Sequence, residues 1–427
     1  MSEGHSFFNL HLNKDSCLAT LLFSIACVIP FIGWYYPAQT ANYVAKFELL
    51  FVVIYLIFDK RFTAIQSLRK NKFLLFLCLT WFFTFSLSFV QLFNQNIFES
   101  QLYMATFRYI FTLMHMLFIL CVISYFNQSK KLSILPLLSS PVIMLLIIFI
   151  FYLVITSGIT IPDKYFINSP PLASNIRYIG YLCTVSSIVS GFIVLTTRVK
   201  LPLFYIIIAV AIANFTFLVW LGGRGAIGAV YACLILYIIY RLKYQTLNFK
   251  RVILISSVIL FSIFLSEILT VYSWNGLGHI FNQSKLQSLN DLDINSFSSN
   301  RVAIWKMSLN AISESPWLGY GPNGYFYLPE RTFGVHPHNL FIQFFLEWGI
   351  IGGTAFSLIL FYAGGHIIKF LILTQHSNND NFILPSLIIC SLTLHALFDG
   401  TYYHAQPVFY LILSFAYIVS ISTKLKS

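Results

Sequence analysis

The sequence predicts an all-α integral membrane protein with about twelve transmembrane helices and one long loop. Of the 427 residues, 58% are hydrophobic and only 9% are charged, whereas soluble domains average about a quarter charged residues. The mean hydropathy is +0.78. The seven cysteines lie in or beside apolar segments without paired spacing, so we expect small buried side chains rather than disulfides or metal ligands. The first apolar run is followed by WYYP rather than by a small-residue cleavage site, which predicts a retained membrane anchor.

Twelve apolar stretches are long enough to cross roughly 30 Å of hydrocarbon. They cover residues 17–36, 43–58, 73–93, 107–126, 135–156, 176–196, 201–221, 225–240, 252–273, 349–374, 383–398 and 406–423. The loops after the second, fourth, sixth and eighth stretches carry Lys60, Arg61, Arg69, Lys70, Lys72, Lys130, Lys131, Arg198, Lys200, Arg241, Lys243, Lys250 and Arg251. The positive-inside rule places these loops and both termini in the cytoplasm. The formal charge of +12 therefore reflects membrane topology, and no nucleic-acid partner is predicted.

One connection is much longer than the others. Residues 274–337 are rich in Ser, Asn, Gly and aromatic residues and separate nine spans in residues 1–273 from three spans in residues 338–427. By alternation this loop faces outward, and a loop of this length is usually functional. Asp291 and Asp293 form a DxD sequence in it. Nucleotide sugars, which such a triad binds through a metal, are cytoplasmic, so we expect an ordinary solvated loop there.

Arg224 lies among glycines at the outer mouth of the eighth stretch, in WLGGRGAIGAV. The glycines leave room for a ligand headgroup, and the amino end of a helix favours an anion. The pattern therefore suits a phosphate. The alternative is an arginine that simply extends its side chain to the membrane interface.

The segment SSNRVAIWKMSLNAISESPWLGYGPNGY predicts a helix that is capped by Ser299 or Asn300 and stopped by Pro316. Arg301 and Trp305 are one turn apart and share a face of this helix. A guanidinium beside an indole can bind a diphosphate and stack on a sugar. Alternatively, a surface arginine covers an interfacial tryptophan.

The segment GVHPHNLFIQFFLEWG places two histidines before an apolar helix. His336 precedes proline and is expected to be extended, and Asn339 is a helix cap. His338 is a candidate general base, the alternative being an interfacial histidine without a catalytic role. No third ligand is near in the sequence, so no metal is predicted. Glu347 is out of phase with His338 on a helix and is expected to form structural hydrogen bonds.

Several other polar residues occur near or within the spans. Arg177 and Arg331 are expected at the outer interface, and Asp399 and His404 are lesser candidates for the same outer cavity. His115 and His395 lie inside apolar stretches, so we expect them to pack against neighbouring helices.

These motifs resemble the O-antigen ligase and O-antigen polymerase superfamily of bacterial inner-membrane glycosyltransferases. The likeness rests on Arg224 and Gly225, on RVAIWKMSLNAISESPWLGYGPNGY, and above all on HPHNLFIQFFLEWGIIGG. It covers residues from about 200 to 375, whereas the first half matches only in its number of spans and its hydropathy.

The resemblance implies a C-type glycosyltransferase-like bundle in the bacterial inner membrane, with an active site that faces the periplasm. The implied donor is a glycan on undecaprenyl diphosphate, and the implied reaction is inverting and needs no metal or other cofactor. Arg224 and Arg301 would hold the diphosphate, and His338 would activate or position the acceptor hydroxyl. The expected substrate-binding residues are Arg177, Trp305, His336 and Asn339, of which Arg177 and His336 fit the chemistry without matching a family motif.

Two acceptors are consistent with this resemblance. A ligase would transfer the glycan to the lipid A-core of lipopolysaccharide, whereas a polymerase would transfer it to a second lipid-linked repeat unit. The single compact outer loop favours a ligase, because no second large outer loop carries arginines. A polytopic transporter or flippase is the alternative from another class, but it predicts matched half-repeats and charges within the spans, and the sequence has no visible repeat.

Overall fold

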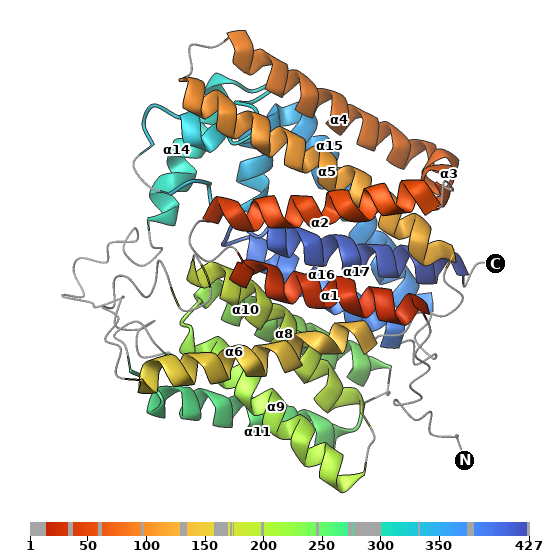
Figure 1. The fold of residues 1–427 in the computed structure, drawn as a ribbon, viewed down its shortest axis with the longest axis vertical. Coiled ribbons are helices and arrows are strands. Elements are labelled where there is room, and N and C mark those ends of the chain that lie inside the picture. The colour runs from red at the N-terminus through yellow and green to blue at the C-terminus, as the bar shows by residue number, and fades with distance from the viewer. Residues whose placement is uncertain are drawn as a thin grey trace.

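The computed structural model describes residues 14–32, 37–58, 62–94, 98–128, 135–157, 170, 173, 175–197, 200–244, 247–271, 276, 300–331, 334–373 and 380–424. Across these residues the regular structure is entirely helical (Figure 1). The α-helices are α1 (Lys14–Ile32), α2 (Pro37–Phe58), α3 (Thr63–Lys70), α4 (Lys72–Gln91), α5 (Glu99–Gln128), α6 (Ser139–Thr156), α8 (Ile176–Thr196), α9 (Leu201–Trp220), α10 (Arg224–Lys243), α11 (Phe249–Ile268), α14 (Arg301–Glu314), α15 (Leu340–Leu373), α16 (Asp380–Ala396) and α17 (Ala405–Lys424). Short 3-10 helices cover η1 (Leu92–Asn94), η2 (Leu135–Leu138) and η3 (Gly324–Tyr327).

The predicted all-α membrane class is confirmed, because ten described helices are long and apolar enough to cross a bilayer. Every one of the twelve predicted stretches overlaps a helix. Two of these, Cys17–Ile29 and Asp380–Ala396, are shorter apolar helices, so the predicted count of twelve is not confirmed. Many large apolar side chains on the long helices remain exposed, Phe58 and Phe76 among them. A chain can expose such side chains when lipid, rather than water, surrounds them.

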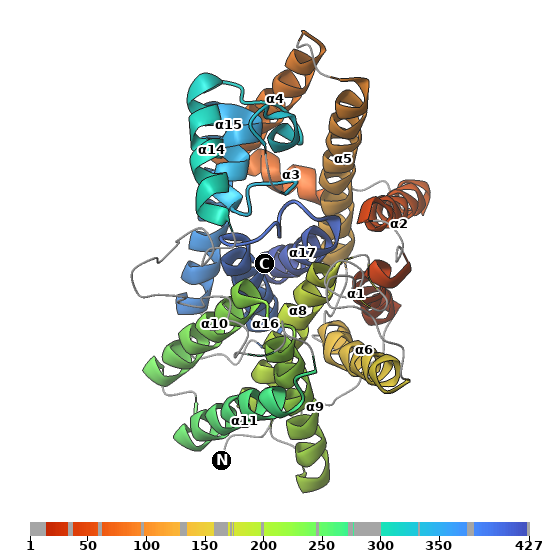
Figure 2. The same cartoon turned by 90° about the vertical axis from the view of Figure 1, so that its left-hand side faces the viewer.

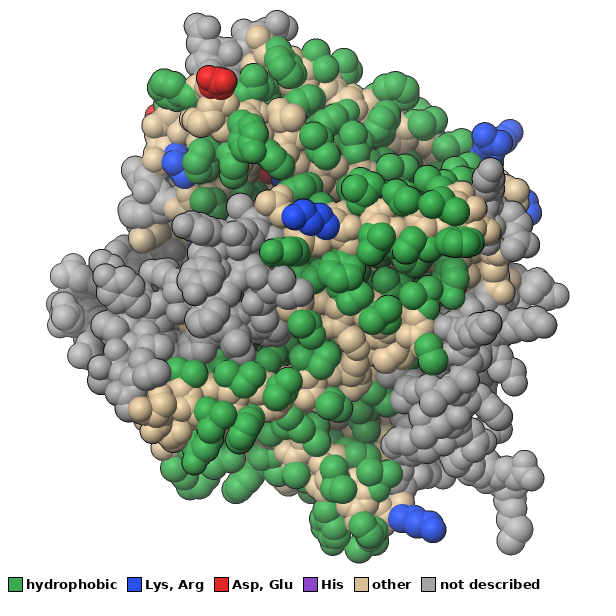
Figure 3. All heavy atoms as spheres, viewed as in Figure 1, with side chains coloured by type: hydrophobic (Ala, Val, Ile, Leu, Met, Phe, Trp, Pro, Cys, Tyr) green, Lys and Arg blue, Asp and Glu red, His purple; other side chains and the backbone are tan. Residues whose placement is uncertain are grey.

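The centre of the bundle is formed by α8 and α17. Both helices are buried along most of their length, and α17 packs against α5 and α16 while α8 packs against α9 and α10. Figure 2 shows α4, α5 and α15 on one side of this centre and α9 and α11 on the other. Hydrophobic side chains cover most of the described face in Figure 3, and charged side chains on it are few.

Helix α15 is broken near its beginning. Gly349 adopts φ 63° and ψ −171° inside the helical run, a conformation that glycine alone adopts readily. The sequence predicts a span that starts at residue 349, and the structure extends the helix back to Leu340 across this break. A side chain at Gly349 would overlap the carbonyl group of Trp317.

The turn that follows α14 satisfies the backbone groups at this break. The Ile350 N–H donates to the Pro316 carbonyl at 2.7 Å, and the Tyr320 N–H donates to the Leu346 carbonyl at 2.8 Å. The Gly- and Pro-rich stretch after α14 therefore docks α14 onto α15. Figure 1 places α14 at the end of the bundle opposite the basic helix α3, so the segments that carry the candidate site lie away from that basic end.

Candidate functional site

The first part of the site is the amino-terminal end of α10. Gly222 has φ 65°, Gly223 is the N-cap residue, and Arg224 is the first residue of the helix. A Cβ on Gly225 would lie 3.2 Å from Cδ2 of His395, so this glycine allows α10 to approach α16 closely. Room for a ligand headgroup, the role predicted for the glycines, stays a prediction.

A cavity of about 370 Å³ opens beside Arg224. It contains two guanidinium groups, one indole and otherwise apolar or small residues. The lining residues are Arg224, Gly225, Gly228, Ala229, Ala232, Arg301, Trp305, Leu394, Leu397 and Phe398. The structure thus brings together Arg224 on α10 and the Arg301 and Trp305 pair on α14, which are about 80 residues apart in the sequence. A cavity with cations at one end and apolar walls suits an amphipathic anion.

Helix α14 begins where the sequence predicts, and Asn300, one of the two predicted caps, is its N-cap residue. The backbone of Asn300 is left-handed at φ 61° and its side chain makes no capping hydrogen bond, while Ser299, the other predicted cap, lies outside the described residues. Because of this turn the helix starts directly with Arg301. Burial lowers the pKa of Arg301, as do the nearby Arg177 and Arg224, while Asp399 opposes the shift. Four charged groups are therefore electrostatically coupled around Arg301.

Residues 336–339 lead into α15, and Asn339 caps that helix as predicted. Its Oδ1 accepts hydrogen bonds from the N–H groups of Phe341 and Ile342 at 3.0 and 3.1 Å. Its Nδ2 donates to the carbonyl of Leu397, so Asn339 also ties this segment to the end of α16. Trp305 Nε1 donates to the carbonyl of Pro337 at 2.9 Å, which joins the cavity wall to the residue before His338.

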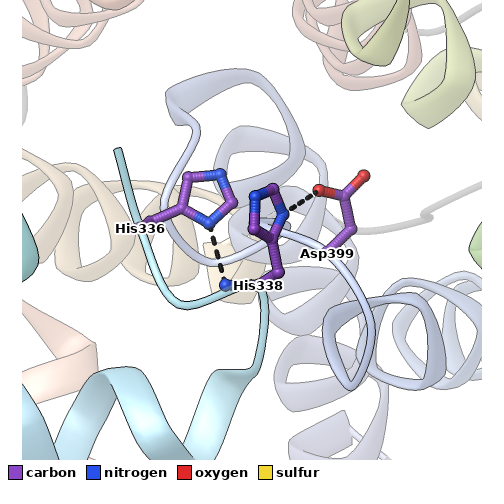
Figure 4. A group of neighbouring side chains, drawn as sticks. All are labelled: His336, His338 and Asp399. Atoms are coloured by element: carbon purple, nitrogen blue, oxygen red, sulfur yellow. Dashed lines mark hydrogen bonds and ion pairs between the residues drawn. The ribbon is translucent and has the colours of Figure 1, made fainter. Parts of the chain in front are cut away.

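His338 adopts a strained backbone conformation. Its φ of 55° lies in the left-handed region, which costs about 1–3 kcal/mol outside glycine and is frequent at functional sites. The N–H of His338 donates to Nδ1 of His336 at 3.2 Å, so the first histidine holds the second in this conformation (Figure 4). A Cβ on Gly334 would lie 3.5 Å from Nε2 of His338, and glycine therefore leaves space beside that nitrogen.

Asp399 pairs with His338 across the site. Nδ1 of His338 lies 3.3 Å from Oδ1 of Asp399, as Figure 4 shows, and the N–H of Gly400 donates to the same oxygen at 2.7 Å. Burial alone would raise the pKa of Asp399, but Arg177, His338 and His395 hold it well below its usual value. An ionised carboxylate only accepts hydrogen bonds. Nδ1 of His338 therefore carries the proton, and in the neutral ring Nε2 is the basic nitrogen.

The pKa of His338 is lowered, chiefly by burial and further by Arg177 and Arg301, while its bond to Asp399 acts in the opposite direction. His338 is thus neutral at pH 7 and able to accept a proton. Arg177, at the start of α8, keeps a half-exposed side chain whose Nε lies 3.8 Å from Oδ1 of Asp399. The Asn175 side chain caps this helix by accepting from the N–H of Arg177.

Two further histidines border Asp399. His395 was expected only to pack between helices; it does contact the Tyr181 ring, but its Nε2 also lies 3.6 Å from Oδ2 of Asp399. His404, a lesser candidate in the sequence, packs edge-on against His336. Burial lowers the pKa of His404 to about 3, so the His404 ring adds polarity to the site without adding positive charge.

His336, His338 and Asp399 could also hold a metal ion, since one ligand atom from each lies within 4.8 Å of the others. No third ligand is apparent beside the histidines in the sequence; in space, Asp399 supplies one. The charge of the surroundings opposes a cation, because Arg177 and Arg301 both act on His338. Nδ1 of each histidine is also used in a hydrogen bond within the cluster.

The remaining candidates lie elsewhere. His115 pairs with Glu48 at 2.7 Å between α5 and α2, and Glu347 accepts a hydrogen bond from Gln343 within α15, as expected for structural groups. Arg331 is bound to the carbonyl of Gly334. Asp291 and Asp293 lie outside the described residues, as do most of the residues on which the predicted 273/274 boundary depends.

Comparison with known families gives one match. Residues 209–357 match a family model described as O-antigen ligase, and the resemblance to the ligase and polymerase superfamily is thereby confirmed for this segment. The segment includes Arg224, Arg301, Trp305, His336, His338 and Asn339 but excludes Arg177 and Asp399. A search of curated proteins found no significant match.

Proposed function

We propose that the protein transfers a glycan from undecaprenyl diphosphate to the lipid A-core of lipopolysaccharide. The match of residues 209–357 to a family model described as O-antigen ligase implies a glycosyltransferase-like enzyme. The reaction would occur at the periplasmic face of the bacterial inner membrane. One observation carries this proposal: Arg224, Arg301 and Trp305 share one apolar-walled cavity. Trp305 is hydrogen-bonded to the residue before His338, and the lining residue Phe398 directly precedes Asp399.

The shape of the cavity supports a lipid diphosphate as the donor. Two guanidinium groups can each make paired hydrogen bonds to phosphate oxygens. Small residues of α10 continue the lining from Arg224 to Ala232, eight residues or roughly 12 Å along the helix axis. A diphosphate would bind at the arginines while the first isoprene units lie along Gly228, Ala229 and Ala232.

The position of His338 supports an acid–base role toward the acceptor. Leu397 and Phe398 line the cavity and directly precede Asp399, while Trp305 is bonded to the residue before His338. A sugar bound at the diphosphate would therefore have its anomeric carbon near Nε2 of His338. Indole and imidazole rings at this point offer flat surfaces for a sugar ring.

In the proposed reaction an acceptor hydroxyl attacks the anomeric carbon from the side opposite the diphosphate. The new bond forms between the acceptor oxygen and that carbon, and the carbon–oxygen bond to the phosphate breaks with inversion. Undecaprenyl diphosphate leaves with the electron pair, and Arg224 and Arg301 stabilise its charge. The hydroxyl proton passes to Nε2 of His338, and Asp399 stabilises the resulting imidazolium through Nδ1.

Deletion of the gene followed by gel analysis of lipopolysaccharide tests the proposal. Complete loss of attached O-chain, with accumulation of lipid-linked polymer, is the result expected of a ligase. A core that carries a single repeat unit would instead indicate a polymerase that uses the same donor. Unchanged lipopolysaccharide would exclude both. Complementation with His338→Ala, expressed at the wild-type level, should reproduce the deletion, and full complementation would remove His338 from the mechanism.

A further inference from the structure

Arg108 is an arginine inside a membrane-spanning helix. It lies nine residues after Glu99, the first residue of α5, and therefore roughly 13 Å along the helix. A guanidinium in an apolar span is costly unless polar groups compensate it. Arg108 does not line the cavity that contains Arg224 and Arg301, so donor binding does not account for it.

Arg108 donates hydrogen bonds to backbone carbonyl groups of the turn between α16 and α17, and it also interacts electrostatically with the buried Glu347 of α15. Nη1 donates to the Tyr403 carbonyl at 2.6 Å, and Nη2 donates to the Tyr402 carbonyl at 3.1 Å. This turn carries Asp399 at its beginning and His404 at its end. Two donors of one rigid guanidinium therefore fix the turn that places Asp399 opposite His338.

A second route leads from Arg108 to the histidines. The guanidinium carbon lies 4.8 Å from the centre of the Tyr403 ring, and that ring lies against the His336 ring with centres 4.7 Å apart. The centres of the His336 and His338 rings are 4.1 Å apart. Tyr403 is also held by its hydroxyl group, which donates to Asn323 Oδ1 at 2.6 Å.

We propose that Arg108 is a positioning residue that fixes the Asp399 turn and the His336 ring, and thereby aligns the His338–Asp399 pair. The inference rests on the proposed function, because alignment matters only if that pair takes part in the transfer. Arg108 makes no direct contact with His338 or Asp399 in the described residues. Its effect on the reaction is therefore indirect, through Tyr403 and the backbone of the turn.

The chain contains a matched control for this arrangement. Arg251 on α11 donates from Nη1 and Nη2 to the carbonyl groups of Val194 and Thr197 at 3.1 and 2.8 Å. Its guanidinium carbon lies 5.0 Å from the centre of the Phe204 ring. Arg251 thus makes the same three kinds of contact as Arg108, but to residues at the ends of α8 and α9 that do not include the site.

The experiment compares Arg108→Met, Arg108→Lys, Arg251→Met and Arg251→Lys in lipid nanodiscs. The substrates are the host's undecaprenyl-diphosphate-linked glycan and lipopolysaccharide that carries only core. A misalignment of about 1 Å costs up to about 100-fold in rate, so kcat of Arg108→Met should fall roughly 10- to 100-fold with donor KM nearly unchanged. The kcat of Arg108→Lys should be intermediate, because lysine keeps the positive charge but lacks the two parallel donors of the guanidinium group. Both Arg251 variants should retain the wild-type kcat.

A double variant separates positioning from general destabilisation. If Arg108 acts through the His338–Asp399 pair, Arg108→Met should cause little further loss in an Asp399→Asn background, which keeps measurable activity, as expected for residues that act as a unit. Equal losses of kcat for the Arg108 and Arg251 variants, additive losses in the double variant, or a raised donor KM with unchanged kcat would each overturn the inference. If Arg108→Met does not fold, a wild-type kcat for Arg108→Lys would overturn it.

The two proposals fail in different ways. If the wild-type protein transfers glycan and His338→Ala does not, but Arg108→Met equals the wild type, only the positioning role is lost. If the wild-type protein transfers no glycan to core lipopolysaccharide or to lipid-linked repeat units, the proposed function fails and the positioning role fails with it.

Discussion

Replacement of Asp399 by asparagine tests the chemistry of the site most directly. The change keeps the shape of the side chain and leaves an oxygen to accept from the Gly400 N–H, now 2.7 Å from Oδ1. It removes the negative charge that faces Nδ1 of His338 at 3.3 Å. A hydrogen bond to a charged group contributes about 1.5–3 kcal/mol and a neutral one about 1 kcal/mol. The imidazolium formed during transfer depends on the charged bond.

If the whole charged bond is lost, 1.5–3 kcal/mol corresponds to a roughly 10- to 150-fold lower kcat, at 1.36 kcal/mol for each factor of ten. Because Asp399 raises the pKa of His338 against the effect of burial, the acid side of the pH profile should also move to lower pH. Glycan transfer by purified protein, measured as initial rates across a pH series, gives both values.

Glu48→Gln is the matched control for Asp399→Asn. Glu48 is also buried and also pairs with a histidine, at 2.7 Å from Nδ1 of His115, but this pair joins α2 to α5 away from the site. We expect this variant to keep the wild-type kcat. A kcat of Asp399→Asn within twofold of the wild type, or an equal loss in Glu48→Gln, would refute the assignment of Asp399 to the reaction.

Three further predictions concern protonation, metals and the break in α15. Because burial and the arginines lower the pKa of His338, kcat should fall to half of its plateau only below about pH 6.5, the pKa of an ordinary histidine. A half-loss of kcat near pH 7 would contradict this. Glycan transfer should survive dialysis against EDTA, whereas excess Zn²⁺ should inhibit it by occupying His336, His338 and Asp399. Loss of transfer in EDTA that Zn²⁺ restores would show that the reaction needs a metal. Gly349→Ala should lower the midpoint of thermal unfolding. A left-handed backbone costs a residue other than glycine about 1–3 kcal/mol, and the new Cβ would overlap the carbonyl of Trp317. An unchanged midpoint would show that stability does not depend on glycine at the break in α15.

The sequence predicts the helices well because apolar stretches of membrane length have few alternative structures. The sequence does not predict the break at Gly349. The predicted span starts at residue 349, whereas α15 extends back to Leu340 across the break, because the turn after α14 bonds the backbone groups on both sides of it. Such tertiary contacts have no local signal in the sequence.

The candidate site is predictable where its residues lie in motifs. Arg224, Arg301 and Trp305 were each proposed from their neighbours in the sequence, and the structure places all three in one cavity. Asp399 is only a lesser candidate in the sequence, because it lies 61 residues after His338, in a different loop. The signal available in the sequence is the scarcity of acidic residues, of which the chain has 14. An acidic residue between two membrane spans needs a polar or charged partner.

The need for Asp399 follows from a conflict between the two halves of the proposed reaction. Arg301, which would stabilise a diphosphate leaving group, also lowers the pKa of His338, as does Arg177, and this weakens His338 as a base. A carboxylate opposite Nδ1 counters this effect without entering the cavity. Arg177 in turn keeps Asp399 ionised, because it helps to hold the pKa of Asp399 well below the usual value despite burial. A site that combined the arginines and His338 without Asp399 would bind the donor but accept the proton poorly, so we expect Asp399→Asn to lower kcat while donor KM remains unchanged.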